Sequence, residues 1–312
     1  MKRPDYWKAI DPAFSCILRR IPFTAPMLYA ASPFVRLSCL LTPLPRGVQH
    51  KRFTKKQGAP VSLFVYAPER CDNPLPALLC LHGGGFGYPA APHQKRLAAL
   101  YAKGASCRVF FPDYRLLPRH PFPAAYDEAL AVYRWMIENA GQLGIDATRI
   151  AVAGDSAGGA LAANVANAAN APDLPLPCYQ MLLYPVTDSR MCTPSMQHYQ
   201  HAPLWDAKNN AAMWKLYLKN ASPAQQKLAS PMENPLPHPP VDAYVETAEI
   251  DCLHDEGVAY AARLKAAGAC VTLQETTGTL HGYDSVFCSA ITKQSIERRI
   301  KLLRQAFYAQ DD

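Results

Sequence analysis

Short, continuous apolar runs alternate with longer amphipathic stretches along the chain from residue 75 onward. Such a run, when it ends at glycine or proline, is typical of a strand buried on both faces of a parallel sheet. The predicted strands are 75–83, 106–114, 149–156, 177–185, 241–251 and 270–276, and the predicted helices are 93–103, 124–139, 157–169, 255–267 and 290–308. This alternation predicts an α/β fold, with a mostly parallel central sheet and helices on both faces.

Two segments depart from this rhythm. Residues 1–45 are apolar and interrupted by prolines, and we expect short helices that cover another part of the molecule. Residues 187–235 are polar and tryptophan-containing, which predicts a helical insertion. Residues 48–67 read as two strands joined by a turn at Gln57–Pro60. We therefore predict an N-terminal cap segment, 1–45, and a main domain, 46–312, with a cap insertion at about 187–235.

Composition narrows the classes of partner. The chain of 312 residues is 49% hydrophobic and carries a net charge of +7, but its basic residues form no long run and no nucleic-acid-binding module. We therefore predict no nucleic-acid partner. The ten cysteines include no CxxC pair and no Cys/His cluster with zinc-ligand spacing. They are typical of free thiols in a reducing cytoplasm, and we expect a cytoplasmic protein without a bound metal.

One uncharged stretch, Ile21–Val35, resembles the apolar part of a signal peptide. It begins later than such a segment normally does, and Pro22, Pro26 and Pro33 interrupt it. It is also too short to span a bilayer. We predict no stable membrane insertion and no long apolar surface segment suited to a lipid interface.

The stretch GDSAGG (154–159) follows a predicted strand and precedes a predicted helix. Small residues on either side of Ser156 allow a sharp turn that would expose its hydroxyl at the carboxyl end of the strand. The Ala157 amide would then lie in the first turn of the helix, where an N–H group has no partner within the helix. The pattern predicts Ser156 as a nucleophile, the alternative being an ordinary turn with a bystander serine.

The stretch HGGG (82–85) follows another buried strand. Successive glycines let backbone N–H groups approach a ligand closely, and no phosphate-binding motif accompanies them. We predict that the Gly83 and Gly84 amides form an oxyanion hole with Ala157. His82 is predicted to be a structural hydrogen-bonding residue and not a base.

A serine nucleophile needs a base and a group that orients it. Of the five histidines after Ser156, only His281 follows a predicted strand and a loop just ahead of the last helix. We predict His281 as the base, the alternative being a surface histidine. Asp251 ends a predicted strand at the same edge of the sheet and is the predicted acid. Asp255 is the second candidate, but an acidic residue in the first turn of a helix has a simpler role as a cap.

From about Leu75 to its end the sequence resembles the hormone-sensitive-lipase-like esterases, a branch of the α/β-hydrolases. The resemblance rests on HGGGF (82–86), DYRLLPRHPFPAAYDE (113–128), GDSAGG (154–159), IDCLHDEG (250–257) and LHGY (280–283). It implies an α/β-hydrolase fold with a helical cap, and it places the acid at Asp251. Cys252 and His254 stand where the family usually has proline and arginine.

These residues together predict a serine carboxylesterase that acts on a small-molecule ester through an acyl-enzyme, with no cofactor. Phe86, Tyr88 and Tyr184 flank the predicted site and are candidates for the acyl pocket. A cap of aromatic residues suits short acyl groups, with acetyl esters among them. Two alternatives stay open, namely a non-catalytic ligand-binding homologue and an amidase or acyltransferase on the same three side chains. The sequence leaves self-association open.

Overall fold

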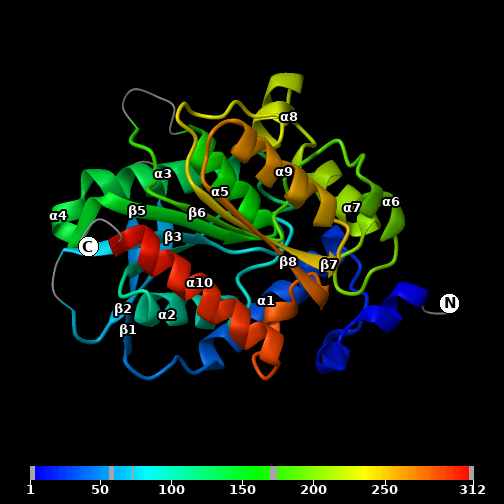
Figure 1. Cartoon of the computed structure of the whole chain (residues 1–312), viewed down its shortest axis with the longest axis horizontal. Helices are drawn as coiled ribbons and strands as arrows, with labels where there is room; N and C mark the ends of the chain where they lie inside the picture. Colours follow the sequence, from blue (N-terminus) through cyan, green and yellow to red (C-terminus); the bar gives the residue numbers. More distant parts are fainter. Residues whose placement is uncertain (1–3, 56–59, 72–73, 169–173, 309–312) are drawn as a thin grey trace.

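The computed structural model describes residues 4–55, 60–71, 74–168 and 174–308. Its core is a sheet of eight strands in the order β1-β2-β4-β3-β5-β6-β7-β8 (Figure 1). The strands from β4 to β8 run parallel, whereas β2 is antiparallel to both of its neighbours. The strands are β1 (Val48–Lys55), β2 (Val61–Pro68), β3 (Leu75–Leu81), β4 (Arg108–Asp113), β5 (Ile145–Asp155), β6 (Gln180–Leu183), β7 (Ala243–Ile250) and β8 (Val271–Leu280).

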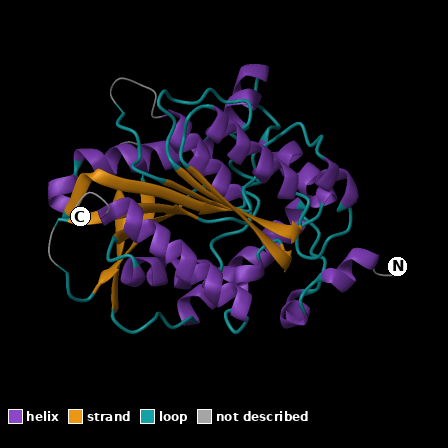
Figure 2. Ribbon diagram, in the orientation of Figure 1, coloured by secondary structure: helices purple, strands orange, loops and turns teal. Residues whose placement is uncertain are grey.

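Helices cover both faces of the sheet, which confirms the predicted fold class (Figure 2). One face carries α3 (Ala124–Glu138), α5 (Ala157–Ala168) and α9 (His254–Ala266), and the other carries α2 (Pro92–Gly104) and α10 (Ala290–Tyr308). Each face has its own apolar core, so the sheet is buried on both sides. A short helix, α4 (Ala140–Leu143), joins α3 to β5. The predicted turn at Gln57–Pro60 lies, except for Pro60, outside the described residues.

The predicted and observed strand ends differ by one to four residues, and two of these differences bear on the site. β6 stops at Leu183, because Tyr184 has a φ of +35° and Pro185 has no N–H to continue the ladder. β8 continues to Leu280, four residues beyond the predicted end. A register shift after Ala248 pairs Ile250 of β7 with Leu280 of β8. This longer pairing brings the residues that follow both strands to one edge of the sheet.

The N-terminal segment is only in part the set of short helices predicted for it. Two short 3-10 helices, η1 (Asp5–Ala9) and η2 (Pro12–Ile17), precede α1 (Ala25–Leu41), a helix of 17 residues. The Thr24 hydroxyl caps it, and Pro26 in its first turn is compatible with a helix.

The outer side of α1 overturns the prediction that the chain has no long apolar surface segment. Phe34, Leu40 and Leu41 are each about 75% exposed. The apolar pattern of this segment runs all round the helix, so the sequence alone did not show which side would be covered. No helix in the described ranges has the length and apolar character needed to cross a membrane.

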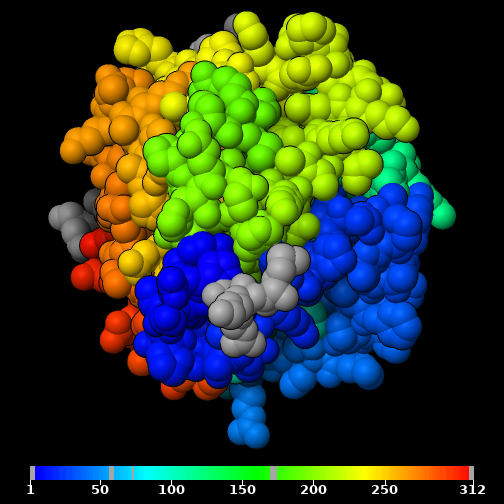
Figure 3. Space-filling view, turned by 90° about the vertical axis from the view of Figure 1, so that its right-hand side faces the viewer, coloured from blue at the N-terminus to red at the C-terminus, as the bar shows by residue number. Residues whose placement is uncertain are grey.

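The segment 187–235 contains three helices, α6 (Pro194–His198), α7 (Ala207–Tyr217) and α8 (Pro223–Ala229). It contacts the N-terminal segment directly, as the blue and yellow-green surfaces of Figure 3 show. The Leu204 amide donates to the Arg19 carbonyl at 2.7 Å, and Arg20 forms an ion pair with Asp206. The Phe23 amide donates to the Asn209 side chain at 2.9 Å. Two segments far apart in the chain thus meet at the same end of the sheet.

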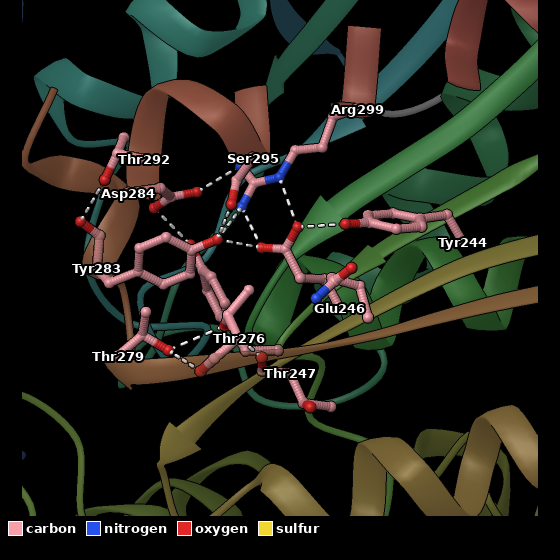
Figure 4. Close-up of polar contacts among 12 residues, drawn as sticks. Tyr244, Glu246, Thr247, Thr276, Thr279, Tyr283, Asp284, Thr292, Ser295 and Arg299 are labelled. Atoms are coloured by element: carbon pink, nitrogen blue, oxygen red, sulfur yellow. Dashed lines mark hydrogen bonds and ion pairs between the residues drawn. The ribbon is translucent and has the colours of Figure 1, made fainter. Parts of the chain in front are cut away.

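A fully buried ion cluster fastens α10 to the sheet (Figure 4). Arg299 of α10 forms ion pairs with Glu246 of β7 and with Asp284 of η3 (Tyr283–Ser285), and all three side chains are inaccessible to solvent. The Tyr283 hydroxyl donates to Glu246 at 2.6 Å. Burial raises the pKa of Asp284, but the charges of Arg299 and His93 and the hydrogen bonds from Tyr184 and Arg299 more than offset this and hold that pKa below its usual range. Asp284 is therefore ionised, and the Arg299 guanidinium contacts both carboxyl groups.

We expect Arg299→Met to lower the free energy of unfolding by about 3–5 kcal/mol, because it leaves two buried carboxylates without their cation. Urea unfolding at neutral pH measures this change. Lys301→Met is the matched control, since Lys301 is exposed on the same helix, and its effect should stay within about 0.5 kcal/mol. Equal unfolding midpoints for the two variants would contradict a stabilising role for the cluster.

Candidate active site

Ser156 lies on a sharp turn between β5 and α5. Its φ of +55° is in the left-handed region, which costs free energy for a residue with a side chain. The turn brings neighbouring backbones into close contact. A Cβ atom on Gly154 would overlap the Gly158 carbonyl, and one on Gly158 would overlap the Leu81 carbonyl. Only glycine fits at either position, and this is why the predicted motif has glycine at both.

His281 and Asp251 reach Ser156 from neighbouring strand ends. His281 follows β8 and Asp251 follows β7, and these strands are parallel neighbours. The His281 Nδ1 atom is 2.6 Å from Asp251 Oδ2, and Nε2 is 2.9 Å from Ser156 Oγ. A carboxylate on Nδ1 favours the tautomer whose Nε2 accepts a proton from the serine hydroxyl. The structure therefore brings the three predicted side chains into one hydrogen-bonded chain.

The carboxylate of Asp251 is itself held in place. Its Oδ1 accepts a hydrogen bond from the Leu253 amide at 3.0 Å, and the side chain is completely buried. Asp255, the second candidate acid, faces away from His281. It accepts hydrogen bonds from the Ser195 amide at 2.7 Å and contacts the His254 ring at 2.8 Å. Burial raises the pKa of Asp255, but these contacts more than offset it and keep the pKa below its usual range.

The glycine loop after β3 corrects one predicted donor. The Gly83 amide donates to Asp155 Oδ1 at 3.0 Å, so it is not free to bind an oxyanion. In the described part of the chain, no group accepts a hydrogen bond from the Gly84, Gly85 or Ala157 amides. Gly84 and Gly85 have φ values of +108° and +60°, and both line the pocket above Ser156. The sequence did not single out Gly85, because a run of three glycines does not show which N–H groups lack an acceptor.

Asp155 connects this loop to the nucleophile. Besides Gly83, it accepts a hydrogen bond from Gln94 Nε2 of α2 at 2.7 Å. Burial, followed by the nearby charge of Asp284, raises the pKa of Asp155 to about 6. Both of its oxygens face N–H donors, so only the ionised carboxylate satisfies both contacts. Asp155, the residue before the predicted nucleophile in GDSAGG, therefore holds the glycine loop in place.

His82 has the structural position predicted for it. Its Nδ1 contacts the Gly83 carbonyl at 2.7 Å, and its ring stacks on Tyr114 at 4.3 Å. The Tyr114 hydroxyl donates to the His82 carbonyl at 2.6 Å. Burial lowers the pKa of His82 to about 4, so the ring is neutral near pH 7.

A pocket of about 530 Å³ opens above Ser156 and His281, and its lining is mostly apolar. Tyr88 and Tyr184, both predicted, line it. Trp205, which was not among the predicted lining residues, also lines it, with its ring centroid 6.0 Å from that of His281. Phe86 is placed elsewhere, because its ring is 1% exposed and stacks on Tyr217 at 3.8 Å.

Tyr184 joins the pocket to the ion cluster beneath it. Its hydroxyl donates to Asp284 at 2.7 Å, and its ring meets the His281 ring edge-on at 4.9 Å. The imidazole therefore packs against a side chain that a buried carboxylate holds in place. No sequence motif links these residues, since 100 positions separate Tyr184 from Asp284.

The chain matches a family model described as the alpha/beta hydrolase fold over residues 78–285. It is 37% identical to an ethyl acetate hydrolase of Pseudomonas putida, over 74% of this chain and 73% of that protein. It is 33% identical to carboxylesterase NlhH of Mycobacterium tuberculosis, over 98% of each chain.

Solved structures agree with these relatives. Esterase LipW from Mycobacterium marinum superimposes with a TM-score of 0.89 at 30% identity, over 98% of both chains. A bacterial heroin esterase superimposes with a TM-score of 0.87 at 28% identity, over 96% of this chain and 99% of that one. The likeness thus includes the N-terminal segment as well as the sheet.

We expect Asp155→Asn to lower kcat by about 10–100-fold at pH 8, because an amide N–H₂ would face one of the two donors and release the glycine loop. In the wild type, acidification through pH 6 protonates Asp155 and weakens one of its two contacts with N–H donors. Part of the fall in kcat on the acid side of the profile should therefore come from Asp155, and the variant should lack that part. Steady-state rates across pH 4–9 measure both effects. Asp127→Asn, at an exposed position on α3, is the control, and identical profiles for all three proteins would contradict the role of Asp155.

Proposed function

The chain belongs to the hormone-sensitive-lipase-like esterases of the α/β-hydrolase family and is a carboxylesterase, and on this premise we propose that it hydrolyses short-acyl esters through an acyl-enzyme on Ser156. One observation carries the assignment of residues. Ser156, His281 and Asp251 form a continuous hydrogen-bonded chain on the floor of an apolar pocket.

The proposed reaction begins when Ser156 Oγ attacks the ester carbonyl and His281 Nε2 takes its proton. Asp251 keeps the imidazole in the required tautomer and stabilises the imidazolium that forms. His281 then gives the proton to the departing alcohol, and the carbonyl re-forms as the acyl-enzyme. In the second half a water molecule, deprotonated by His281, attacks that acyl group. Ser156 leaves with the proton, and the carboxylic acid is released.

The negative charge that develops on the carbonyl oxygen needs preorganised donors. We assign this role to the amides of Gly84, Gly85 and Ala157, in place of Gly83. The assignment is supported by the position of Gly84 and Gly85 at the pocket, by the place of Ala157 next to Ser156 in the first turn of α5, and by the engagement of the Gly83 amide with Asp155. Loss of one such donor typically costs about 10²–10³ in kcat.

We also propose that residues 1–45 and the insertion 187–235 together act as the cap that selects the acyl group. Both segments supply lining, with Ile17 and Val35 from the first and Leu204 and Trp205 from the second. The preference for short acyl groups is supported by the aromatic side chains beside the nucleophile and by the likeness to the ethyl acetate hydrolase.

Three alternative functions are compatible with the same fold, namely ligand binding without catalysis, amide hydrolysis and acyl transfer. A non-catalytic ligand-binding role has no need for the aligned serine, imidazole and carboxylate, and the hydrogen bonds among them argue against it. Amide hydrolysis and acyl transfer would use the same three side chains, and analysis of the products separates them from ester hydrolysis.

We expect the protein to hydrolyse p-nitrophenyl acetate, and Ser156→Ala to reduce kcat by about 10⁴-fold or more because the nucleophile is lost. Release of p-nitrophenol measures the rate, and labelling by a fluorophosphonate reports the nucleophile directly. Ser38→Ala, at an exposed position on α1, is the matched control. Labelling that persists in Ser156→Ala would contradict the assignment.

Within a series of p-nitrophenyl esters, we expect kcat/KM to be highest for acetate and butyrate and to fall for acyl chains of about eight carbons or more, because the aromatic lining limits the room. Trp205→Ala should shift the preference to longer chains, by about 10-fold in the ratio of octanoate to acetate rates. Trp214→Ala is the control, because Trp214 is buried on α7 of the same insertion and does not line the pocket. Rates that climb steadily with chain length in the wild type would refute the short-acyl preference.

A further inference from the structure

One helix carries most of the large apolar side chains that are exposed among the described residues. Five of the eight large apolar side chains that are exposed in the described residues lie on α1. Four of them, Phe34, Leu37, Leu40 and Leu41, form what we call the α1 stripe, with exposures of 75%, 55%, 76% and 75%. Their spacing places them on the side of the helix opposite the buried Leu28 and Cys39. A stripe of this kind on an otherwise folded protein marks a contact with another apolar phase or molecule.

The charged residues of segment 12–68, which contains the α1 stripe, are all of one sign. Residues 12–68 contain eight lysines and arginines and no aspartate or glutamate, which leaves 24 basic and 25 acidic residues in the rest of the chain. The net positive charge of the protein therefore belongs to this segment. In the structure Arg36, Arg46, Lys51 and Arg52 are exposed. Such a distribution attracts a negatively charged surface.

Three cations converge on a cleft at one end of the stripe. Arg36, Arg52 and Lys95 line this cleft of about 200 Å³, and Leu40 of the stripe forms part of its wall. Asp113, which pairs with Arg36 at 2.8 Å, is the single acidic residue in its lining. Three cations against one carboxylate leave an excess that suits a phosphate group.

The half-buried ammonium of Lys95 adds to this preference. It lies 3.8 Å from the centroid of the Phe64 ring, and burial lowers its pKa. An anion in the cleft would offset the cost of burying this charge.

We propose that α1 docks on an anionic phospholipid surface, with the α1 stripe in the boundary between headgroups and acyl chains and a lipid phosphate in the cleft of Arg36, Arg52 and Lys95. An amphipathic helix with basic flanks binds such surfaces through buried apolar area together with attraction to anionic lipids. A second copy of this chain fits less well. A two-fold interface places the same patch against itself, which would bring the basic residues of one copy against those of the other.

Docking would place the pocket entrance at the lipid. Ala31 and Val35, on the inner side of the same helix, line the pocket above Ser156. An ester that partitions into the headgroup region would then reach the nucleophile without crossing bulk water. This consequence rests on the proposed function, whereas the docking itself does not.

Co-sedimentation with large vesicles tests the docking without any ester present. We expect the wild type to bind vesicles of phosphatidylcholine with about 30% phosphatidylglycerol at least tenfold more tightly than vesicles of phosphatidylcholine alone. Binding should weaken strongly at about 0.5 M salt, which screens the attraction.

Two variants separate the apolar and the ionic contributions. Leu37→Asp and Arg52→Gln should each weaken binding to the anionic vesicles, by about tenfold and about fivefold. Leu273→Ser removes a leucine that is 38% exposed on β8, away from α1, and should bind as the wild type does. Unchanged hydrolysis of a water-soluble ester by all three variants confirms that they are folded.

Three results would overturn the proposal. The first is equal binding to neutral and anionic vesicles. The second is binding by Leu37→Asp that matches the wild type. The third is a wild-type dimer, seen by sedimentation, that Leu37→Asp converts to a monomer while neither protein binds vesicles, because the stripe would then be an interface between two copies.

Discussion

The hydrogen bond between His281 and Asp251 requires a buried carboxylate and an imidazole to be held at a fixed distance, and much of the structure around them provides this. A buried carboxylate is costly unless donors surround it, and here the Leu253 amide and the imidazole supply them. The two residues meet because β7 and β8 are parallel neighbours and because the register shift near Ala248 extends their pairing to Leu280. Behind them, the paired Arg299 and Asp284 fix Tyr184, on which the imidazole rests.

A second constraint is close approach of backbone to backbone. The strand-to-helix turn is so tight, and lies so near the end of β3, that glycine alone fits at 154 and 158. Asp155 exploits this proximity, because one carboxylate reaches both the Gly83 amide and the Gln94 side chain. The position of the free amides thus depends on a carboxylate whose pKa is raised to about 6.

The sequence predicted the sheet, its helices and the three aligned side chains, because apolar periodicity and the order of motifs report on strand ends. It did not predict which glycine amides are free, since that depends on the partner that Asp155 provides. It did not place Trp205 at the pocket, because an aromatic residue in a predicted helical segment has the same pattern whether it faces a core or a pocket. The sequence also did not predict the exposure of Leu40 and Leu41, because hydrophobicity alone does not show whether another part of the protein covers a helix.

The contact between Arg19 and Leu204 joins the N-terminal segment to the insertion 187–235, and the two segments together affect how the sequence can diverge. The proposed reacting atoms lie at strand ends, whereas much of the pocket wall comes from two segments that the sheet does not need for its own pairing. On the proposed function, insertions or substitutions in those segments would change the compounds admitted while the arrangement of serine, imidazole and carboxylate persists. The proposed chemistry and the proposed selectivity thus depend on separate stretches of the chain, and one can vary while the other is kept.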